Sequence, residues 1–234
     1  MFDIRPYTDL GQLNIDWLHA HYHFSFANYY DPKRMSLGHL RVINDDIISA
    51  GGGFDFHPHR DMEIITYVRT GAITHEDSLR NRGITRAGDV QVMSAGTGIT
   101  HAERNEESVA TTLYQIWITP RSTGTKPRFE AKQFPKRVTD QLELLVSGFA
   151  EHAGGHALSI NQDAAIYGAT LKEGVALSHA LHGAGYLLVS KGSIALNGNT
   201  LNQGDGVAIT DETSIQFTTL APSEIVLIDL PAYA

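Results

Sequence analysis

Two short steps, His57-Pro58-His59 and His101-Ala102-Glu103, constrain the fold of this chain more than any other feature of its sequence. Side chains at positions i and i+2 of a strand point to the same face of the sheet. Two neighbouring strands that carry these steps would bring three imidazoles and one carboxylate together, a donor set that suits a divalent transition metal. We therefore expect both segments to lie side by side in one sheet.

Turn residues frame both steps. Three consecutive glycines precede the first, and Gly71 follows it after the apolar run Ile64 to Val68. Gly88-Asp89 precedes the second step. After this turn, Val90 and Val92 stand at alternate positions, as in a strand. Apolar runs bounded by Gly, Asn and Asp are typical of strands, and they recur along the rest of the chain. A mostly β protein with few helices is expected.

The two halves of the chain have matching patterns, which indicates a diverged internal repeat. Val68-Arg-Thr-Gly71-Ala-Ile has a counterpart in Val189-Ser-Lys-Gly192-Ser-Ile. The segment from Thr119 to Pro135, rich in Pro, Gly, Lys and Arg, is interpreted as the crossover between the halves. We expect two domains in tandem, residues 1–134 and 135–234.

The second half does not keep the ligand set. Counting from its equivalent glycines places Ser178 and Ala180 at the first step, and Phe217 and Thr219 at the second. These residues do not form a strong donor set for a metal. The second domain is therefore expected to be free of metal.

The other histidines are weaker candidates. His19-Ala20-His21-Tyr22-His23 has strand spacing and is the best competing metal site, but no glycines frame it, and we interpret it as an exposed cluster. His179 and His182 are three residues apart, so they alternate faces of a strand and are interpreted as surface or gap-filling residues. The remaining candidates without a partner at ligand spacing are His39, His75, His152 and His156.

Composition excludes several classes of protein. The chain has no cysteine, which excludes disulfides and thiolate ligands, so any metal has to use nitrogen and oxygen donors. Its formal net charge of -8 argues against direct binding to nucleic acid. There is no secretion signal and no apolar run of membrane-spanning length, so we expect a cytoplasmic protein without membrane contact.

The residues around both steps resemble the two conserved motifs of the cupin superfamily. The matching residues are Gly51, His57, His59, Glu63 and Gly71 in the first motif, and Gly88, His101 and Asn105 in the second. Ser94 stands where the second motif usually has proline, and the interval from Gly96 to His101 is two residues longer than usual. Both departures are features of the pirin branch.

Longer phrases are similar to bacterial pirin-like proteins. These phrases run from Phe24 to Pro32, His57 to Glu63, Met93 to His101 and Leu113 to Ile118. The likeness is dense from Met1 to about Phe134 and thinner, but traceable, to the end of the chain. The resemblance implies an all-β bicupin, with two β-barrel (jelly-roll) domains in tandem and few short helices.

Two glutamates compete for the fourth ligand position. Glu63 is the usual cupin choice and keeps the parity of the preceding histidines, but an apolar run follows it and indicates entry into the core. Pirins instead use the residue two positions after the second-motif histidine. We therefore expect His57, His59, His101 and Glu103 to bind one divalent transition metal per chain. The resemblance favours Fe(II), while Zn, Ni, Cu, Mn and Co stay open.

Three neutral imidazoles and one carboxylate leave a divalent ion with a net charge of about +1 and with open positions. A deprotonated flavonol oxygen fits that demand, and Glu103 is the candidate catalytic base. Phe54, Phe56 and Met93 either line a pocket for such a flat substrate or belong to the barrel core. The resemblance implies a dioxygenase that opens quercetin-like flavonols with O2. The alternative is a metal- or redox-responsive regulator that acts through protein contacts, although the sequence marks no partner surface.

Overall fold

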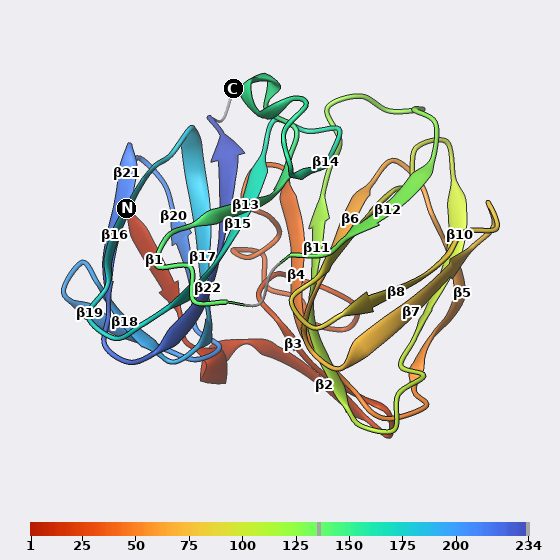
Figure 1. Cartoon of the computed structure of the whole chain (residues 1–234), viewed down its shortest axis with the longest axis horizontal. Helices are drawn as coiled ribbons and strands as arrows, with labels where there is room; N and C mark the ends of the chain where they lie inside the picture. Colours follow the sequence, from red (N-terminus) through yellow and green to blue (C-terminus); the bar gives the residue numbers. More distant parts are fainter. Residues whose placement is uncertain (135–136, 233–234) are drawn as a thin grey trace. The chain divides into compact units, whose positions relative to one another are not determined.

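The computed structural model describes residues 1–134 and 137–232. These residues form strands joined by turns, with two short 3-10 helices, η1 (Tyr7–Asp9) and η2 (Ala150–His152). The expectation of an all-β bicupin with few short helices is confirmed (Figure 1). Within the described ranges, no helix is long and apolar enough to cross a membrane.

The chain divides into two compact units. Among the described residues, the N-terminal barrel consists of residues 11–134 and Leu158–Gln162, and the C-terminal barrel of Met1–Leu10, residues 137–157 and residues 163–232. This division differs from the domains expected at 1–134 and 135–234, because β1 (Phe2–Arg5) pairs with β20 (Gly206–Ile209). Phe2 and Ile4 pack against the core of the C-terminal barrel, which accounts for the placement of the first residues.

The N-terminal barrel has a larger and a smaller sheet, with strand orders β12-β9-β6-β11-β4-β3-β2 and β5-β10-β7-β8 (Figure 1). Its strands are β2 (Gly11–Ile15), β3 (Leu18–Tyr22), β4 (Leu40–Ile48), β5 (Gly53–His59), β6 (Glu63–Thr70), β7 (Ala72–Asp77), β8 (Arg82–Arg86), β9 (Val90–Ser94), β10 (Ile99–Arg104), β11 (Thr111–Ile118) and β12 (Arg128–Lys132). The short β14 (Leu158–Ser159) also belongs to this unit.

The segment expected as a crossover is partly a strand. β12 pairs with β9 and forms the edge of the larger sheet, so residues 128–132 belong to the N-terminal barrel. Pro135, the last residue of the expected crossover, lies outside the described residues.

The C-terminal barrel repeats this plan. The strands of this unit have the orders β1-β20-β17-β22-β15-β13 and β16-β21-β18-β19 within their sheets. Its other strands are β13 (Glu143–Ser147), β15 (Ala165–Leu171), β16 (Ala176–Ala180), β17 (Gly183–Lys191), β18 (Ser193–Leu196), β19 (Asn199–Asn202), β21 (Ser214–Thr219) and β22 (Ser223–Pro231).

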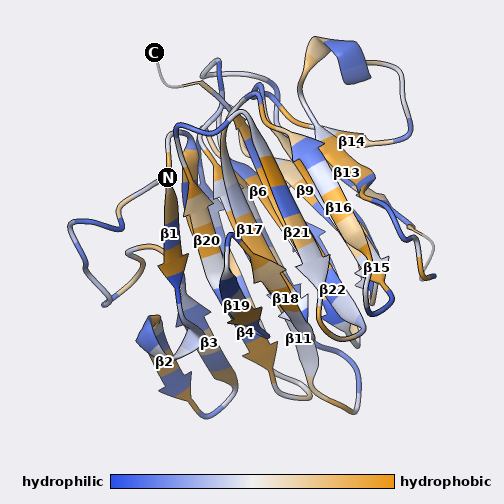
Figure 2. Cartoon of the chain, turned by 90° about the vertical axis from the view of Figure 1, so that its left-hand side faces the viewer, coloured by the Kyte–Doolittle hydropathy of each residue, from blue (hydrophilic) through white to orange (hydrophobic). Residues whose placement is uncertain are grey.

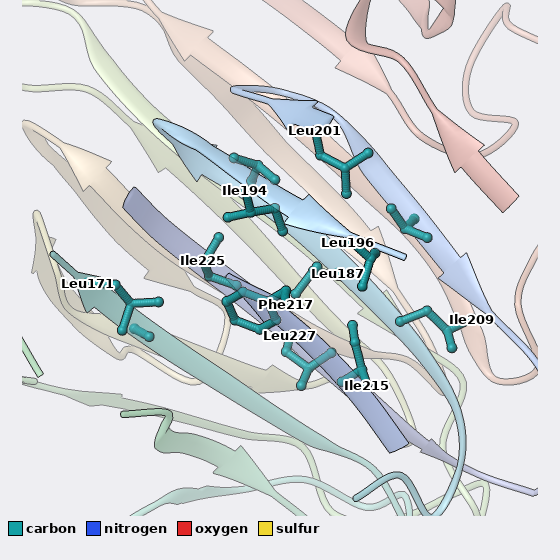
Figure 3. Close-up of a cluster of buried hydrophobic side chains, with 13 residues drawn as sticks. Leu171, Leu187, Ile194, Leu196, Leu201, Ile209, Ile215, Phe217, Ile225 and Leu227 are labelled. Atoms are coloured by element: carbon teal, nitrogen blue, oxygen red, sulfur yellow. The ribbon is translucent and has the colours of Figure 1, made fainter. Parts of the chain in front are cut away.

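Strand alternation builds the core of the C-terminal barrel. Along β21, Ile215, Phe217 and Thr219 are buried while the residues between them are exposed, and Figure 2 shows the corresponding alternation in hydropathy. Figure 3 shows Phe217 within a cluster of aliphatic side chains from both sheets. Two of the positions that correspond to ligand positions, Phe217 and Thr219, are therefore buried in this barrel.

The interior of the N-terminal barrel is different, because polar residues separate two apolar clusters. One cluster contains Ile48, Val68 and Leu113, and the other contains Ile64 and Met93. Between them, Thr66, Gln91 and Gln115 of the larger sheet hydrogen-bond to Glu103 of the smaller sheet. Burial of these polar groups is tolerated because they are hydrogen-bonded to one another. The barrel thus has a polar layer in its interior.

Two glycines permit the close packing that this barrel needs. Gly71, between β6 and β7, has φ of +73°, and a Cβ there would lie 2.5 Å from Oγ1 of Thr111. At Gly53 a Cβ would lie 2.4 Å from the carbonyl oxygen of Glu103. A side chain at either position would force neighbouring backbone apart.

Candidate metal centre

The structure places the two steps on adjacent strands. β5 and β10 are antiparallel neighbours, with His57 opposite His101 and His59 opposite Ile99. The imidazole ring centroids are 4.8 Å apart for His57 and His59, 4.5 Å for His57 and His101, and 5.0 Å for His59 and His101. One nitrogen from each ring lies within 4.8 Å of the other two, so these three histidines can hold one metal ion.

The hydrogen bonds of these rings leave their Nε2 atoms available. Nδ1 of His57 lies 2.7 Å from the carbonyl oxygen of Asp55, which can only accept a hydrogen bond, so Nδ1 carries the proton. Nε2 of His59 and Nε2 of His101 are buried and have no hydrogen-bond partner. Buried polar atoms normally have a hydrogen-bond partner, so two buried nitrogens without one indicate a missing partner. Together with the nitrogen of His57 they fit a metal ion.

His59 and His101 also have the protonation state that a ligand requires. Burial, assisted by repulsion from His57, lowers the pKa of His59 to about 4. Burial and the neighbouring histidines lower the pKa of His101 to about 2. Both rings are therefore neutral near pH 7, and neutral imidazole is the form that binds metals.

Glu103 follows a bulge in β10. The register with β5 shifts between His101 and Glu103, which places Glu103 opposite Phe54. One carboxylate oxygen of Glu103 lies within 4.8 Å of a ring nitrogen of His75 and of His101. The other group of possible ligands, His57, His59 and His101, does not include Glu103. The structure thus brings Glu103 to one of the three histidines, and its role as fourth ligand stays a prediction.

Two amides orient the Glu103 carboxylate. Oε1 of Gln115 accepts the indole N–H of Trp117, so its amide N–H points to Oε2 of Glu103 at 2.7 Å. Oε1 of Gln91 accepts the hydroxyl of Thr85, so its amide donates to Oε1 of Glu103 at 2.5 Å. Burial raises the pKa of Glu103 to about 7, although these hydrogen bonds act to lower it.

Glu63, the competing glutamate, lies elsewhere. It begins β6, after a turn in which Asp61 has φ of +47°, so it loses the parity of the steps on β5. Its carboxylate accepts a hydrogen bond of 2.6 Å from Ser94. Among the described residues it joins neither candidate metal group. Its placement favours Glu103 over Glu63.

His75, to which the sequence assigned no role, lies at the centre. Its Nδ1 is 3.4 Å from Nδ1 of His101, and its Nε2 is 3.1 Å from Oδ2 of Asp77. Burial outweighs the effect of Asp77 and lowers the pKa of His75. Burial acts to raise the pKa of Asp77, but hydrogen bonds, first from Asn81 and then from His75, outweigh it and hold that pKa below its usual value. His75 and Asp77 are two residues apart, like the residues of the two steps. This spacing is the sequence signal that indicates a role for His75 at the site.

The aromatic and apolar residues near the ligands separate into different environments. Met93 is buried in an apolar cluster, and Phe54 packs edge-on against Trp17. Phe56 is 58% exposed. Trp117 packs edge-on against His59, with ring centroids 4.9 Å apart. A surface hollow of about 370 Å3 reaches His59, and its other lining residues are Pro58, Arg60, Ser78, Gly98, Ile99 and Thr100.

The competing histidine cluster does not form a metal group among the described residues. His19 is exposed and His21 half-buried, while the alternate residues of β3, Leu18, Ala20 and Tyr22, pack in the core. His23 lies beyond the end of β3 and is buried rather than exposed. The cluster is therefore divided between environments.

The two histidines of the C-terminal barrel are paired rather than merely on the surface or filling gaps. Nε2 of His179 and Nδ1 of His182 lie 3.0 and 2.8 Å from Oδ2 of the fully buried Asp229. Nε2 of His182 also lies 3.0 Å from Glu151. The alternation expected from their spacing fails because β16 ends at Ala180.

Comparisons with known proteins agree with the all-β bicupin fold. The family model described as Pirin matches residues 3–118, and the model described as Quercetinase C-terminal cupin domain matches residues 144–230. A protein of Caulobacter vibrioides named Pirin-like protein is 51% identical over 98% of this chain and 99% of its own. Quercetin 2,3-dioxygenase of Escherichia coli strain K12 is 42% identical over 99% of both chains. The crystal structure of the bacterial pirin YhhW from Escherichia coli in complex with nickel(II) has a TM-score of 0.92, 41% identity and complete coverage of both chains.

Proposed function

The chain belongs to the pirin family, and we propose that it is a metal-dependent dioxygenase that opens the heterocycle of quercetin-like flavonols with O2. The observation that carries the proposal is the convergence of three imidazoles, two of which have buried, unpartnered Nε2 atoms. The name of the Escherichia coli relative supports the reaction, and the hollow that reaches His59 offers access.

His57, His59 and His101 would hold the metal, with Glu103 as the fourth ligand. These are nitrogen and oxygen donors, which suit several divalent metals, and a nickel(II) complex of a relative supports one such ion per chain. The family resemblance favours Fe(II) as the native metal. When bound, the metal supplies a Lewis acid that stabilises the flavonol oxyanion and draws substrate and O2 together.

The residues of the chain supply the base and its support. Glu103 is buried beside the histidines. Because a metal-bound carboxylate is normally a weak base, Glu103 accepts the 3-hydroxyl proton of a flavonol only if it binds the metal through one oxygen or is released during the reaction. Gln91, Gln115 and Thr66 hold its carboxylate in place through hydrogen bonds. Trp117 fixes the orientation of Gln115 and also contacts the ring of His59.

The test is oxygen uptake by metal-loaded protein on a panel of flavonols, with metal content measured on the same samples. We expect His101→Ala to lose the metal and the activity with the fold intact. His21→Ala is the matched control, because His21 lies outside both candidate groups, and it should keep both. Loss of metal in the His21 variant together with retention in the His101 variant would contradict the site.

A second variant tests the base. Glu103→Gln keeps the size and one oxygen donor but removes the base, so a metal-loaded variant should lose on the order of a hundredfold or more in rate. Activity should partly recover as pH rises and the free flavonol ionises. Full activity in this variant would contradict the role of Glu103. Absence of oxygen uptake by the unmodified, metal-loaded protein would favour the regulatory alternative.

A further inference from the structure

A chain of buried hydrogen bonds ends at the Nδ1 atom of His101. From its geometry we propose that His75 and Asp77 are positioning residues that hold the His101 imidazole in the tautomer and orientation of a metal ligand. The proposal rests on the metal centre described above and is independent of the reaction that the centre performs.

The strand register brings these residues together. β7 and β10 are antiparallel neighbours, with Asp77 opposite His101 and His75 opposite Glu103. His75 is fully buried, and His101 and Asp77 are nearly so. The ring of His75 is stacked on Phe129, with centroids 3.9 Å apart and an angle of 4° between the planes. Stacking and burial leave the His75 ring little freedom to rotate.

Asp77 determines which nitrogen of His75 carries the proton. Its Oδ1 accepts the backbone N–H groups of Leu79 and Asn81 at 2.9 and 3.0 Å. Its Oδ2 accepts the side-chain amide of Asn81 at 2.8 Å and lies 3.1 Å from Nε2 of His75. A carboxylate that already accepts hydrogen bonds from three N–H groups is ionised, so it also acts as an acceptor toward its fourth partner, Nε2 of His75. Nε2 of His75 therefore carries the proton, and its Nδ1 has the lone pair.

The same reasoning fixes the tautomer of His101. Its Nδ1 faces the Nδ1 lone pair of His75 at 3.4 Å, so Nδ1 of His101 has to donate. Its Nε2, which is buried without a partner, then has a lone pair free for a metal. In this arrangement both nitrogens of His75 are engaged, so His75 supports a ligand and is not one itself. Hydrogen bonds behind ligand histidines are a general device for fixing tautomer and ring orientation.

The tautomers can be read directly in the metal-free protein. Two-bond ¹H–¹⁵N correlation spectra of uniformly ¹⁵N-labelled, chelator-treated protein distinguish Nδ1–H from Nε2–H imidazole. We expect Nδ1–H for His101 and Nε2–H for His75. An Nε2–H tautomer for His101 would overturn the proposal, and this measurement depends neither on metal binding nor on activity.

Nickel(II) affinity of variants gives a second, independent readout. His75→Phe keeps a ring against Phe129 but removes the acceptor, and it should raise the nickel Kd by about 10- to 100-fold. His75→Asn retains an oxygen acceptor near the position of Nδ1, and it should bind nickel within a few-fold of the unmodified protein. Ile73→Val, a buried truncation on the same strand, is the control for a loss of packing alone and should leave the Kd unchanged.

Three results of the nickel titrations would overturn the proposal. They are an unchanged Kd in His75→Phe, a His75→Asn variant as weak as His75→Phe, and an Ile73→Val variant as weak as either. A failure of the proposed function looks different. In that case the unmodified protein binds nickel and shows the expected tautomers, while oxygen uptake on flavonols is absent.

Discussion

Metal binding should release a proton from Glu103, and the number of protons released reports whether this residue is a ligand. In the metal-free protein, burial raises the pKa of Glu103 to about 7. A carboxylate that binds a metal has to be ionised. At pH 6 a group with this pKa carries about 0.9 proton, which metal binding would displace, and this falls to about 0.5 at pH 7 and about 0.1 at pH 8. Glutamine at position 103 has no proton to release.

The assay is calorimetric titration of nickel(II) into the unmodified protein and into Glu103→Gln, in buffers with different enthalpies of ionisation. The difference in proton release between the two proteins isolates Glu103, because contributions from other groups cancel. His59 and His101 contribute little at these pH values, since burial already lowers their pKa values to about 4 and about 2. A difference near zero at pH 6 would mean one of two things: Glu103 keeps its proton and is not a ligand, or it is already ionised in the metal-free protein and the reasoning from burial is wrong. The pKa of Glu103 in the metal-free protein, measured by NMR titration, separates the two.

Three further perturbations test other parts of the structure. In Asn105→Ala the carbonyl oxygens of Ile48, Ser49 and Val109, of which only that of Ile48 makes a fully buried bond, lose their donor. The free energy of unfolding in urea should fall by about 2 kcal/mol, and a fall below about 1 kcal/mol would contradict the role of this amide. Trp117→Phe removes the N–H that orients Gln115 and should weaken nickel binding by about tenfold, whereas an unchanged Kd would leave the Gln115 amide without influence on the centre. Burial acts to lower the pKa of His182, but Asp229 outweighs it and raises that pKa, so Asp229→Asn should lower it in an NMR titration. Because this pKa is higher in the folded than in the unfolded chain, the interaction stabilises the fold at low pH, and the stabilisation is lost as pH rises through the folded pKa.

The sequence patterns predicted a mostly β protein because their signals are local, and the resemblance to pirin-like proteins added the bicupin fold. Turn glycines and strand alternation act within a few residues, so the framed steps at His57 and His101 are visible without any knowledge of tertiary pairing. The placement of β1 is a different case, since nothing near Phe2 indicates a partner at Ile209.

The candidate site shows the same limit. Parity predicts which residues share a face of one strand, but it does not say which strands are neighbours. The two-residue spacing of His75 and Asp77 is visible in the sequence, but only the pairing of β7 with β10 connects these residues with His101. Parity also fails where a strand ends, as between His59 and Glu63 and between His179 and His182. The polar layer around Gln91 and Gln115 has no sequence signal of its own, because a buried glutamine in a strand resembles an exposed one until the facing sheet is known.

The pairing of β1 with β20 has a consequence for the order in which the chain matures. Arg5 pairs with Gly206, so about 200 residues separate the two strands. At a synthesis rate of about 5–20 residues per second, β1 waits about 10–40 s for its partner to be made. Closing a loop of this length also carries an entropic cost that makes the contact slow to form. Until then β1 presents unpaired backbone N–H and C=O groups that other extended segments can engage. β1 is thus made about 200 residues before it can be paired.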